Sequence, residues 1–167
     1  MSEPVNENDR RGIIKIAPIT PTDAELVAGI LAASLVKPVW TARDIATFIH
    51  QPGVHGFTAI YEGYPAGVLL YRQVLAEAEI LTLGVAKEFQ RRGIATALMA
   101  EAHINIETTG GTKVFLEVAV NNKSAEKLYK NLGYISINTR HNYYQVDDYF
   151  INAEVFCKSF IKKSKKS

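Results

Sequence analysis

The sequence predicts a single α/β (α+β) domain, built on one mixed β-sheet that carries helices on both faces. Three observations lead to this fold class. The chain has 167 residues, which suits one domain, and 47% of them are hydrophobic, which is enough for a core. Strand-like and helix-like segments follow one another in the order β-α-α-β-β-β-α-β-α-β-β. This order combines hairpins with two strand–helix–strand crossovers, and the sequence contains no internal repeat.

The first third of the chain is predicted to form a short strand and two helices. We expect the strand at residues 13–16, followed by prolines that end it. Thr22 and Glu25 have the spacing of a capping box, and the apolar residues after them recur at helical intervals. Thr41 can cap the second helix, which the Pro-Gly pair at 52–53 stops.

The rest of the chain alternates between strands and helices. Residues 57–61 and 66–74 are typical of a hairpin, because they flank a turn that contains glycine and proline. The strand at 80–85 is mostly apolar and is therefore expected to be central in the sheet. The remaining predicted elements are a helix from Ile94 to Gly110-Gly111, a strand at 114–120, a helix at 124–132 closed by Gly133, and strand-like segments at 134–138, 142–146 and 151–160.

The composition excludes several classes of protein. A formal net charge of +2 does not suggest a nucleic-acid-binding domain, which would carry a strongly basic face. The single cysteine, Cys157, rules out an internal disulfide and a multi-cysteine metal site, and its apolar neighbours predict that it packs in the core. His50, His55 and His103 have no metal-ligand spacing, so we expect no metal.

The two ends of the chain are polar. Residues 1–12 lack periodicity and are predicted to form a flexible N-terminal arm, residues 13–160 the folded domain, and the lysine-rich residues 161–167 a solubilising tail. The N-terminus has no apolar segment of a secretory signal, and no apolar run approaches the roughly 20 residues that cross a bilayer. We therefore expect a cytoplasmic protein with no membrane contact.

The stretch 83–96 is the most informative part of the sequence. A buried strand runs into a loop with a Gln-x-x-Gly-x-Ala pattern, and this loop opens an amphipathic helix. The start of such a helix presents unpaired backbone N–H groups, and its dipole favours an anion there. Gly93 and Ala95 are small enough for a phosphate to approach the backbone, while Arg91 and Arg92 add positive charge. The segment predicts a pyrophosphate site, although an ordinary loop before a helix can show the same short pattern.

Several motifs, taken in order, resemble the GCN5-related N-acetyltransferase (GNAT) family. Gln-Arg-Arg-Gly-Ile-Ala at 90–95, between a strand and a helix, is similar to the acetyl-CoA motif of that family. Phe-Leu-Glu-Val at 115–118, Asn122 and the segment 128–134 resemble its second half. Arg-His-Asn-Tyr-Tyr at 140–144, the acidic pair Asp147-Asp148 and Pro38-Val39-Trp40-Thr41 resemble the RimI group, the bacterial ribosomal-protein-alanine N-acetyltransferases. The resemblance covers roughly residues 13–158.

The resemblance implies the GNAT fold, which is one mixed, mostly antiparallel sheet of about seven strands, splayed in the middle and flanked by four helices. The strand that ends at Val85 and the strand that contains Glu117 would diverge, with acetyl-CoA between them. Its pantetheine arm would pair with the backbone at 83–85, and its pyrophosphate would lie over 91–96. The residues expected to bind acetyl-CoA are Leu83, Gly84, Val85, Arg91, Arg92, Gly93, Ile94, Ala95, Thr96 and Asn122.

Acetyl transfer needs a base, because an ammonium ion has no lone pair with which to attack. Glu117 is the candidate base, since it lies among apolar residues of a strand, where a carboxylate is out of place unless it faces a ligand site. Burial raises the pKa of a carboxylate toward neutrality, which suits this role. The alternative is a glutamate on the solvent face of a half-exposed strand. Family members often carry an arginine two residues later; here Ala119 takes that place, so we expect a basic contact to the substrate to be missing.

Tyr129 is the candidate acid, because the matching tyrosine of the family protonates the departing thiolate of coenzyme A. Its alternative is packing on an amphipathic helix, and one tyrosine can do both. The backbone N–H of Val85 is the expected donor to the oxyanion. Tyr143 and Tyr144 are expected to line the pocket of the amine, although aromatic strand residues are more often core residues.

The leading hypothesis for function is acetylation of the N-terminal α-amine of a protein, with the N-terminal alanine of a ribosomal protein as the substrate. One alternative is acetylation of a small amine such as a polyamine, an amino acid or an antibiotic. A different class of alternative is an acyl-CoA-binding protein without catalysis, and the presence of both Glu117 and Tyr129 counts against it. The sequence is compatible with a monomer or a homodimer.

Overall fold

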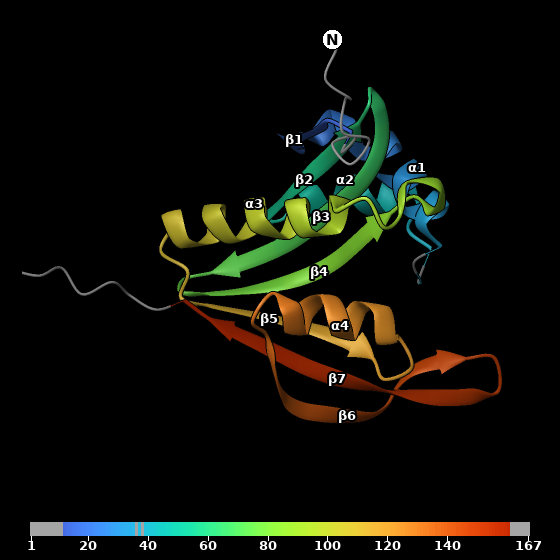
Figure 1. The fold of residues 1–167 in the computed structure, drawn as a ribbon, viewed down its shortest axis with the longest axis vertical. Helices are drawn as coiled ribbons and strands as arrows, with labels where there is room; N and C mark the ends of the chain where they lie inside the picture. Colours follow the sequence, from blue (N-terminus) through green and yellow to red (C-terminus); the bar gives the residue numbers. More distant parts are fainter. Residues whose placement is uncertain (1–11, 36, 38, 161–167) are drawn as a thin grey trace, which may run out of the picture.

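The computed structural model describes residues 12–35, 37 and 39–160, and it places seven strands in one sheet (Figure 1). Their order across the sheet is β1-β2-β3-β4-β5-β7-β6. The strands are β1 (Ile14–Pro18), β2 (Val54–Tyr61), β3 (Tyr64–Val74), β4 (Glu77–Val85), β5 (Lys113–Ala119), β6 (Ile135–Val146) and β7 (Tyr149–Ser159). The α-helices of the described residues are α1 (Ala24–Ser34), α2 (Ala42–Ile49), α3 (Ile94–Thr108) and α4 (Lys123–Asn131). The predicted mixed sheet and the predicted order of elements are confirmed.

The middle of the sheet divides where β4 meets β5. This is the one parallel pair among the described strands, and it extends only over Glu77–Glu79 of β4 and residues 113–115 of β5. All other neighbouring strands pair in antiparallel fashion. In Figure 1, β4 and β5 start close together and then separate. We call the separated segments, residues 80–85 of β4 and 116–119 of β5, the fork.

Two apolar cores lie on the two faces of the sheet. Successive residues of β3 alternate between them, since Leu69 and Tyr71 belong to the larger core and Val68 and Leu70 to the smaller one. The larger core includes residues of α3, β5 and α4, and the smaller one includes residues of α1 and α2. Burying one such side chain contributes about 1.5–3 kcal/mol. Helices therefore cover both faces of the β2–β4 half, as the sequence predicts.

Local signals explain most helix ends. At the start of α2, the Asp44 N–H donates to the Thr41 hydroxyl oxygen (3.1 Å), which confirms the predicted cap; such a cap contributes about 1 kcal/mol. The predicted Thr22–Glu25 box is wrong by two residues. The Asp23 carboxylate instead accepts from the Thr20 N–H (2.7 Å), ahead of a short 3-10 turn (Pro21–Asp23) that leads into α1.

Other predicted boundaries move by a few residues. The first strand runs over Ile14–Pro18, so Pro18 is its last residue and does not lie beyond its end. The strand lies at the edge of the sheet, where proline is tolerated. The two strand-like segments predicted at 134–138 and 142–146 form the single strand β6, which has an irregularity between Arg140 and Tyr144. The predicted arm (except Gly12), the predicted tail and Pro38 lie outside the described residues.

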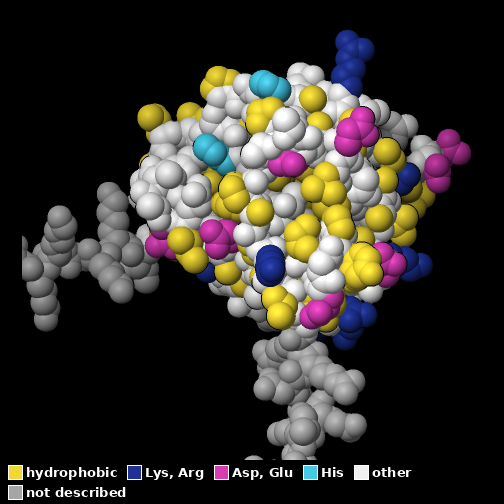
Figure 2. All heavy atoms as spheres, turned by 90° about the horizontal axis from the view of Figure 1, so that it is seen from above, with side chains coloured by type: hydrophobic (Ala, Val, Ile, Leu, Met, Phe, Trp, Pro, Cys, Tyr) yellow, Lys and Arg dark blue, Asp and Glu magenta, His cyan; other side chains and the backbone are white. Residues whose placement is uncertain are grey.

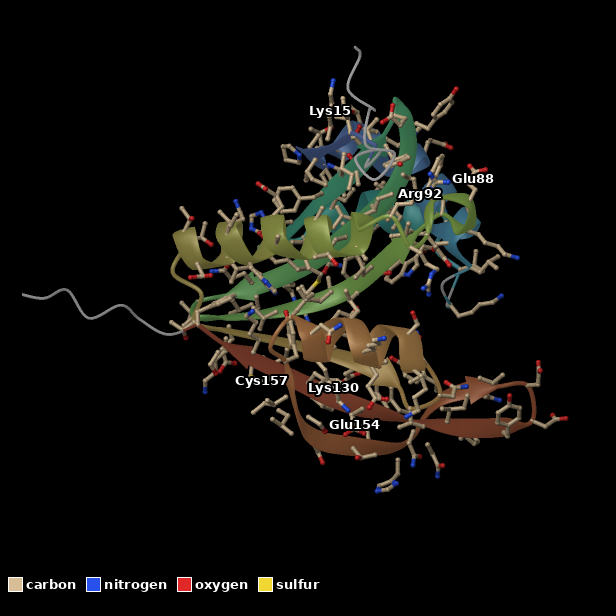
Figure 3. All side chains as sticks on the ribbon, in the orientation of Figure 1. Lys15, Glu88, Arg92, Lys130, Glu154 and Cys157 are labelled. Carbon is tan, nitrogen blue, oxygen red and sulfur yellow. The ribbon has the colours of Figure 1, made fainter. Side chains whose placement is uncertain are left out.

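The surface mixes charges. On the face in Figure 2, acidic and basic side chains are interspersed among apolar ones. No helix in the described ranges combines the length and apolarity that crossing a bilayer requires. Within these ranges, no three His, Cys, Asp or Glu side chains group as metal ligands. Cys157 lies half-buried on β7 (Figure 3).

Candidate active site

One wall of the fork is the backbone of β4. The Ala86 N–H donates to the Ala66 carbonyl of the β3 side (2.8 Å), and Val85 is the next residue back in the same ladder. Because peptide groups alternate in direction along an antiparallel strand, those of Leu83 and Val85 point away from β3 and into the fork. The Gln90 side chain reaches this edge from the following loop and donates to the Val85 carbonyl (3.2 Å).

Gly84, unlike Leu83 and Val85, directs its peptide groups toward β3 and lies under α1. It pairs with Val68, so the same alternation turns its peptide groups toward β3 and away from the fork. A Cβ added at Gly84 would lie 2.7 Å from the Ser34 Oγ of α1. The missing side chain therefore lets α1 pack closely on the sheet. Of the three predicted backbone partners at 83–85, only Leu83 and Val85 present their N–H and C=O groups to the fork.

The loop before α3 holds its backbone in an unusual conformation. Arg91 has φ 62° and Gly93, the N-cap of α3, has φ 81°. The side chains of Thr41 and Asn122 cap α2 and α4, but no side chain caps α3. The first N–H bonded within α3 is that of Ala97, which donates to Gly93 (3.0 Å). The three preceding N–H groups have no acceptor in the helix and are free for an anion.

The space beside this helix start is open. Among the described residues, its two chain neighbours aside, no atom lies within 4 Å of a Cβ added at Gly93, so glycine is needed there for its positive φ. The predicted pyrophosphate residues are spread around the opening. Thr96 and Arg91 are exposed, whereas the Ile94 side chain is buried in the core, so only its N–H faces outward.

Arg92 is exposed, but an aromatic ring holds its guanidinium. Its guanidinium lies 5.2 Å from the centre of the Tyr61 ring and donates to the Tyr61 hydroxyl (3.4 Å). Figure 3 shows Arg92 beside the N-terminal end of α3. The Tyr61 ring in turn packs against the ring of Phe89 in the same loop, with 5.9 Å between the ring centres. Arg92 therefore ties the loop to β2, and Arg91 is the more available cation.

Asn122 follows β5 at the far side of the fork. Its side-chain oxygen accepts from the Ala125 N–H (3.1 Å), which caps α4. The residue is exposed. A cap of this kind fixes where α4 begins and thereby where Tyr129 lies in that helix, two turns further on. The amide nitrogen of Asn122 stays available as a donor.

Glu117 lies on the other wall of the fork, on the sheet face opposite α4. Its neighbours Leu116 and Val118 belong to the core that includes Tyr129, so strand alternation turns Glu117 to the opposite side. There it borders a hollow of about 410 Å³, whose charged lining residues are Arg72, Glu77, Glu79, Glu117 and Arg140. The Glu117 side chain is only 15% exposed, so the alternative of a solvent-facing glutamate does not describe it.

Arg140 reaches Glu117 from two strands away. The Arg140 Nε donates to the Glu117 Oε1 at 2.7 Å. Arg140 is paired with Ala153 of β7, and β7 separates β6 from β5. The long side chain therefore crosses β7, where the small Ala153 is fully buried. Position 119 is an alanine, and the basic group beside Glu117 comes instead from another strand, a contact that the sequence did not predict.

An irregularity in β6 brings Tyr143 and Tyr144 close to Glu117. Between the Arg140–Ala153 and Tyr144–Ile151 pairs, three residues of β6 face one of β7. Asn142, inside this bulge, has φ 53°, and its N–H donates to the Asn152 side chain (2.9 Å). Bulges of this kind redirect side chains at functional sites.

Glu117 contributes to raising the pKa values of both tyrosines. A hydrogen bond to the Glu117 carboxylate raises the pKa of Tyr143, because it stabilises the protonated phenol. Burial, followed by the charge of Glu117, raises the pKa of Tyr144. The two rings meet edge to face at 5.0 Å, and Tyr143 is 47% exposed. Tyr143 and Tyr144 therefore border Glu117, and Tyr143 forms an open rim.

Tyr129 lies on the α4 side of the fork. It is 7% exposed and its ring packs edge to face against Tyr134 at 5.7 Å. Burial, with a smaller contribution from Tyr144, raises the pKa of Tyr129 above its ordinary value. Its hydroxyl has no hydrogen-bond partner among the residues that the structure describes. Tyr129 is thus a protonated phenol that packs in the core and still has a proton to donate.

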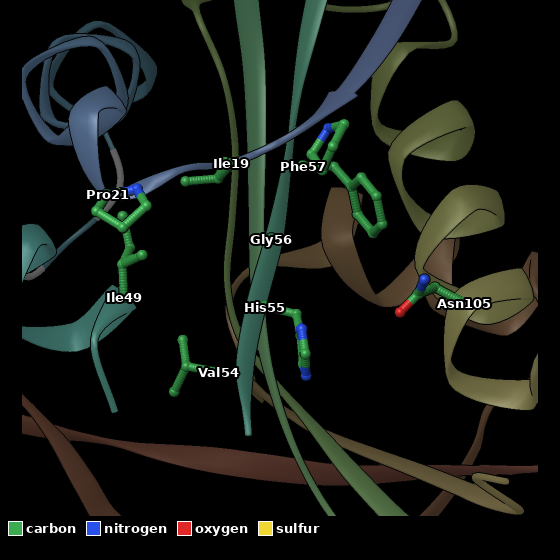
Figure 4. A pocket seen from close by; sticks show the side chains of 9 residues that line it. Ile19, Pro21, Ile49, Val54, His55, Gly56, Phe57 and Asn105 are labelled. Carbon is green, nitrogen blue, oxygen red and sulfur yellow. The ribbon is translucent and has the colours of Figure 1, made fainter. Parts of the chain in front are cut away.

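A second hollow, of about 250 Å³, lies along β2 (Figure 4). Ile19, Pro21, Ile49 and Val54 border it on one side of the strand, and His55, Phe57 and Asn105 on the other. Its lining is mostly apolar, and Asn105 already accepts a hydrogen bond from Tyr71 (2.5 Å). None of the predicted site residues lines this hollow.

Comparison with known proteins points to one family. Residues 25–134 match the acetyltransferase (GNAT) family. The chain is 31% identical over 140 residues to N-alpha-acetyltransferase RimI of Mycobacterium tuberculosis, a match that covers 80% of this chain and 85% of that protein. It is 32% identical over 92 residues to the ribosomal protein bS18-alanine N-acetyltransferase of Escherichia coli strain K12, covering 55% of this chain and 62% of that protein. The latter match spans less than two thirds of the length of the E. coli protein.

The solved structures agree with this comparison. The crystal structure of the ribosomal-protein-S18-alanine N-acetyltransferase from Escherichia coli has a TM-score of 0.82 to this chain at 25% identity. The superposition covers 91% of this chain and 98% of that one. The fork, the uncapped start of α3 and the contacts of Glu117 with Arg140 and Tyr143 therefore occur within a fold of known type.

Proposed function

The chain belongs to the acetyltransferase (GNAT) family, and from this premise we propose that it transfers the acetyl group of acetyl-CoA to the N-terminal α-amine of a protein. One observation carries the proposal. The uncapped start of α3 and the fork-facing edge of β4 lie on one wall of the fork, and Glu117 borders the other. An anion-binding helix start, a strand edge and a carboxylate are what binding an acyl-CoA and deprotonating an amine require.

The residues at the start of α3 fit the diphosphate of the coenzyme. The N–H groups of Ile94, Ala95 and Thr96 are the unpaired donors of the first turn, and Arg91 adds charge beside them. The open space at Gly93 lets an anion reach the backbone. Leu83 and Val85 would pair with the amide groups of the pantetheine arm, as one strand pairs with another. Bound acetyl-CoA supplies the activated thioester.

Glu117 would take the proton of the amine, directly or through water. A free α-amine has a pKa of about 8, so a minor fraction is already neutral at pH 7, and a modest base suffices. The N–H of Val85 would donate to the oxygen that becomes negative as the amine attacks. Tyr129 would then donate its proton to the departing sulfur, since burial keeps the phenol protonated.

The similar proteins of Escherichia coli and Mycobacterium tuberculosis support a protein acceptor. The former is named for the alanine of ribosomal protein bS18, and the latter is named an N-alpha-acetyltransferase. We therefore propose the N-terminal alanine of a ribosomal protein as the substrate. The exposed ring of Tyr143 at the rim of the site suits an acceptor that continues into solution, as a peptide does.

A panel of acceptors tests this proposal. The purified chain would be incubated with acetyl-CoA and either N-terminal hexapeptides or small amines, namely a polyamine, an amino acid and an aminoglycoside. Mass spectrometry would locate the acetyl group. We expect acetylation of alanine-terminated peptides at the α-amine. Turnover of small amines alone would refute the protein acceptor, and no turnover of any amine would refute the enzymatic role. Mass spectrometry of ribosomal-protein N-termini with and without the protein would identify the substrate in cells.

A further inference from the structure

Arg140 has no role in the mechanism above, yet it forms an ion pair with the candidate base. Its Nε lies 2.7 Å from the Glu117 Oε1. The guanidinium also lies 5.4 Å from the centre of the Tyr143 ring, so it is held between a carboxylate and an aromatic face. The arginine side chain is 53% exposed and the glutamate only 15%, so the pair faces solution mainly through the arginine.

The β6 bulge builds this arrangement. Arg140 is the last residue in regular pairing before the bulge, and Tyr143 lies within it. The Asn142 N–H is bonded to the Asn152 side chain, which fixes the turn between them. Arg140 and Tyr143 therefore both reach Glu117, although a regular strand would turn residues three apart to opposite faces.

The charge of the acceptor makes this contact consequential. Most of a free α-amine is an ammonium ion at pH 7, because its pKa is about 8. A bare carboxylate would bind that ion as a salt bridge and stabilise its unreactive, protonated form. A guanidinium on the same carboxylate offsets the negative charge and repels a second cation. The neutral amine, which can attack, suffers no such repulsion.

We propose that Arg140 is a positioning residue that holds Glu117 and prevents it from trapping the acceptor as an ammonium ion, so that the neutral amine is the form bound for reaction. This inference rests on the proposed function and gives a role in it to Arg140, to which the motif at 140–144 assigned none. The other charged or titratable groups around the pair are Tyr143 and Tyr144 on β6, Tyr129 on α4, Arg72 on β3, and Glu77 and Glu79 on β4. Among these, only Arg72 is a cation, and it pairs with Glu79.

The test is the pH dependence of kcat and KM for an alanine-terminated peptide in wild type, Arg140→Gln, Arg140→Lys and Arg72→Gln. Arg72→Gln is the matched control, since it removes an arginine that is paired with a glutamate in the same hollow. Rates would be measured between about pH 6 and 10, a range that spans the pKa of an α-amine. Thermal melting would check that each variant folds.

We expect the rising limb of the kcat profile of Arg140→Gln to move to higher pH by about one unit, a tenfold loss of kcat at pH 7. This loss should vanish at the alkaline end, and KM for the peptide should stay equal or fall. Arg140→Lys should restore most of the profile, and Arg72→Gln should match wild type. An equal loss at every pH, or a rise in KM alone, would overturn the inference and leave the proposed function intact. If wild type turns over no amine at any pH, the proposed function fails and this inference fails with it.

Discussion

The Nε2 of His103 on α3 lies 2.7 Å from the hydroxyl oxygen of Tyr134, which follows Gly133 at the end of α4. Both side chains are buried, at 8% and 2% exposure. Since α3 packs on the β4 side of the fork and α4 follows β5, this hydrogen bond joins the two halves of the divided sheet. Tyr134 also packs against Tyr129, so the bond supports the candidate acid.

This buried histidine predicts a loss of stability in mild acid. Burial, followed by the charge of Lys158, lowers the pKa of His103 to about 4, whereas an unfolded chain has a histidine pKa of about 6.5. As pH falls, the unfolded state binds the proton first. The stability is therefore fully present above pH 6.5 and is lost as pH falls toward 4. The loss between about pH 7.5 and 5 is about 2 kcal/mol.

Urea unfolding at the two pH values measures this difference. His103→Gln removes the titrating group, so the free energy of unfolding of this variant should fall between the two pH values by about 2 kcal/mol less than that of wild type. His50→Gln, at an exposed residue that bonds to the Ala46 carbonyl, should behave as wild type does. Identical pH dependence in wild type and His103→Gln would contradict the assignment.

Glu117→Gln should lower kcat by about 100-fold, because the amide cannot accept the proton of the amine. The side chain is similar in size, so affinity for acetyl-CoA, measured by calorimetry, should not change. Glu79→Gln is the matched control, since it also alters a glutamate paired with arginine on the same sheet face. A full rate in Glu117→Gln would show that another group or water is the base.

Tyr129→Phe should lower kcat by about 100-fold while leaving stability nearly unchanged. The phenyl ring keeps the packing against Tyr134, and the lost hydroxyl has no hydrogen-bond partner among the described residues. Kinetics and thermal melting together measure the two effects. Tyr149→Phe, at a residue that is 57% exposed on the β6–β7 hairpin, controls for removal of a phenol. A large drop in melting temperature without a drop in kcat would make Tyr129 a packing residue only.

Gly93→Ala should weaken binding of acetyl-CoA about tenfold or more, because a side chain would stand where a phosphate approaches the backbone. The positive φ of 81° also costs an alanine about 1 kcal/mol of stability. Gly110→Ala separates the two effects. Gly110 has φ 91° and equally open surroundings, but it lies at the other end of α3. Both variants should lose similar stability in urea, and only Gly93→Ala should bind the coenzyme more weakly by calorimetry.

The sequence alone determined the elements whose causes are local. The helix start around Gly93 is predictable, since the glycine, the arginines and the following apolar periodicity lie within one short segment. The cap at Thr41 and the closure after α4 at Gly133 are local for the same reason. The order of strands and helices, and thus the mixed sheet, follows from hydrophobic periods that each segment carries by itself.

Only the tertiary structure decided what surrounds Glu117. Arg140 is 23 positions away in the sequence (140 − 117) and meets Glu117 because β7 inserts between β5 and β6, and the bulge of β6 brings Tyr143 to the same carboxylate. Neither the strand order nor the bulge is encoded within one segment, and a shift of one residue in register would turn Arg140 to the opposite face. The meeting of His103 and Tyr134 depends in the same way on how α3 and α4 pack across the fork. Local sequence fixes which groups are present, and long-range pairing fixes which of them are close enough to act on one another.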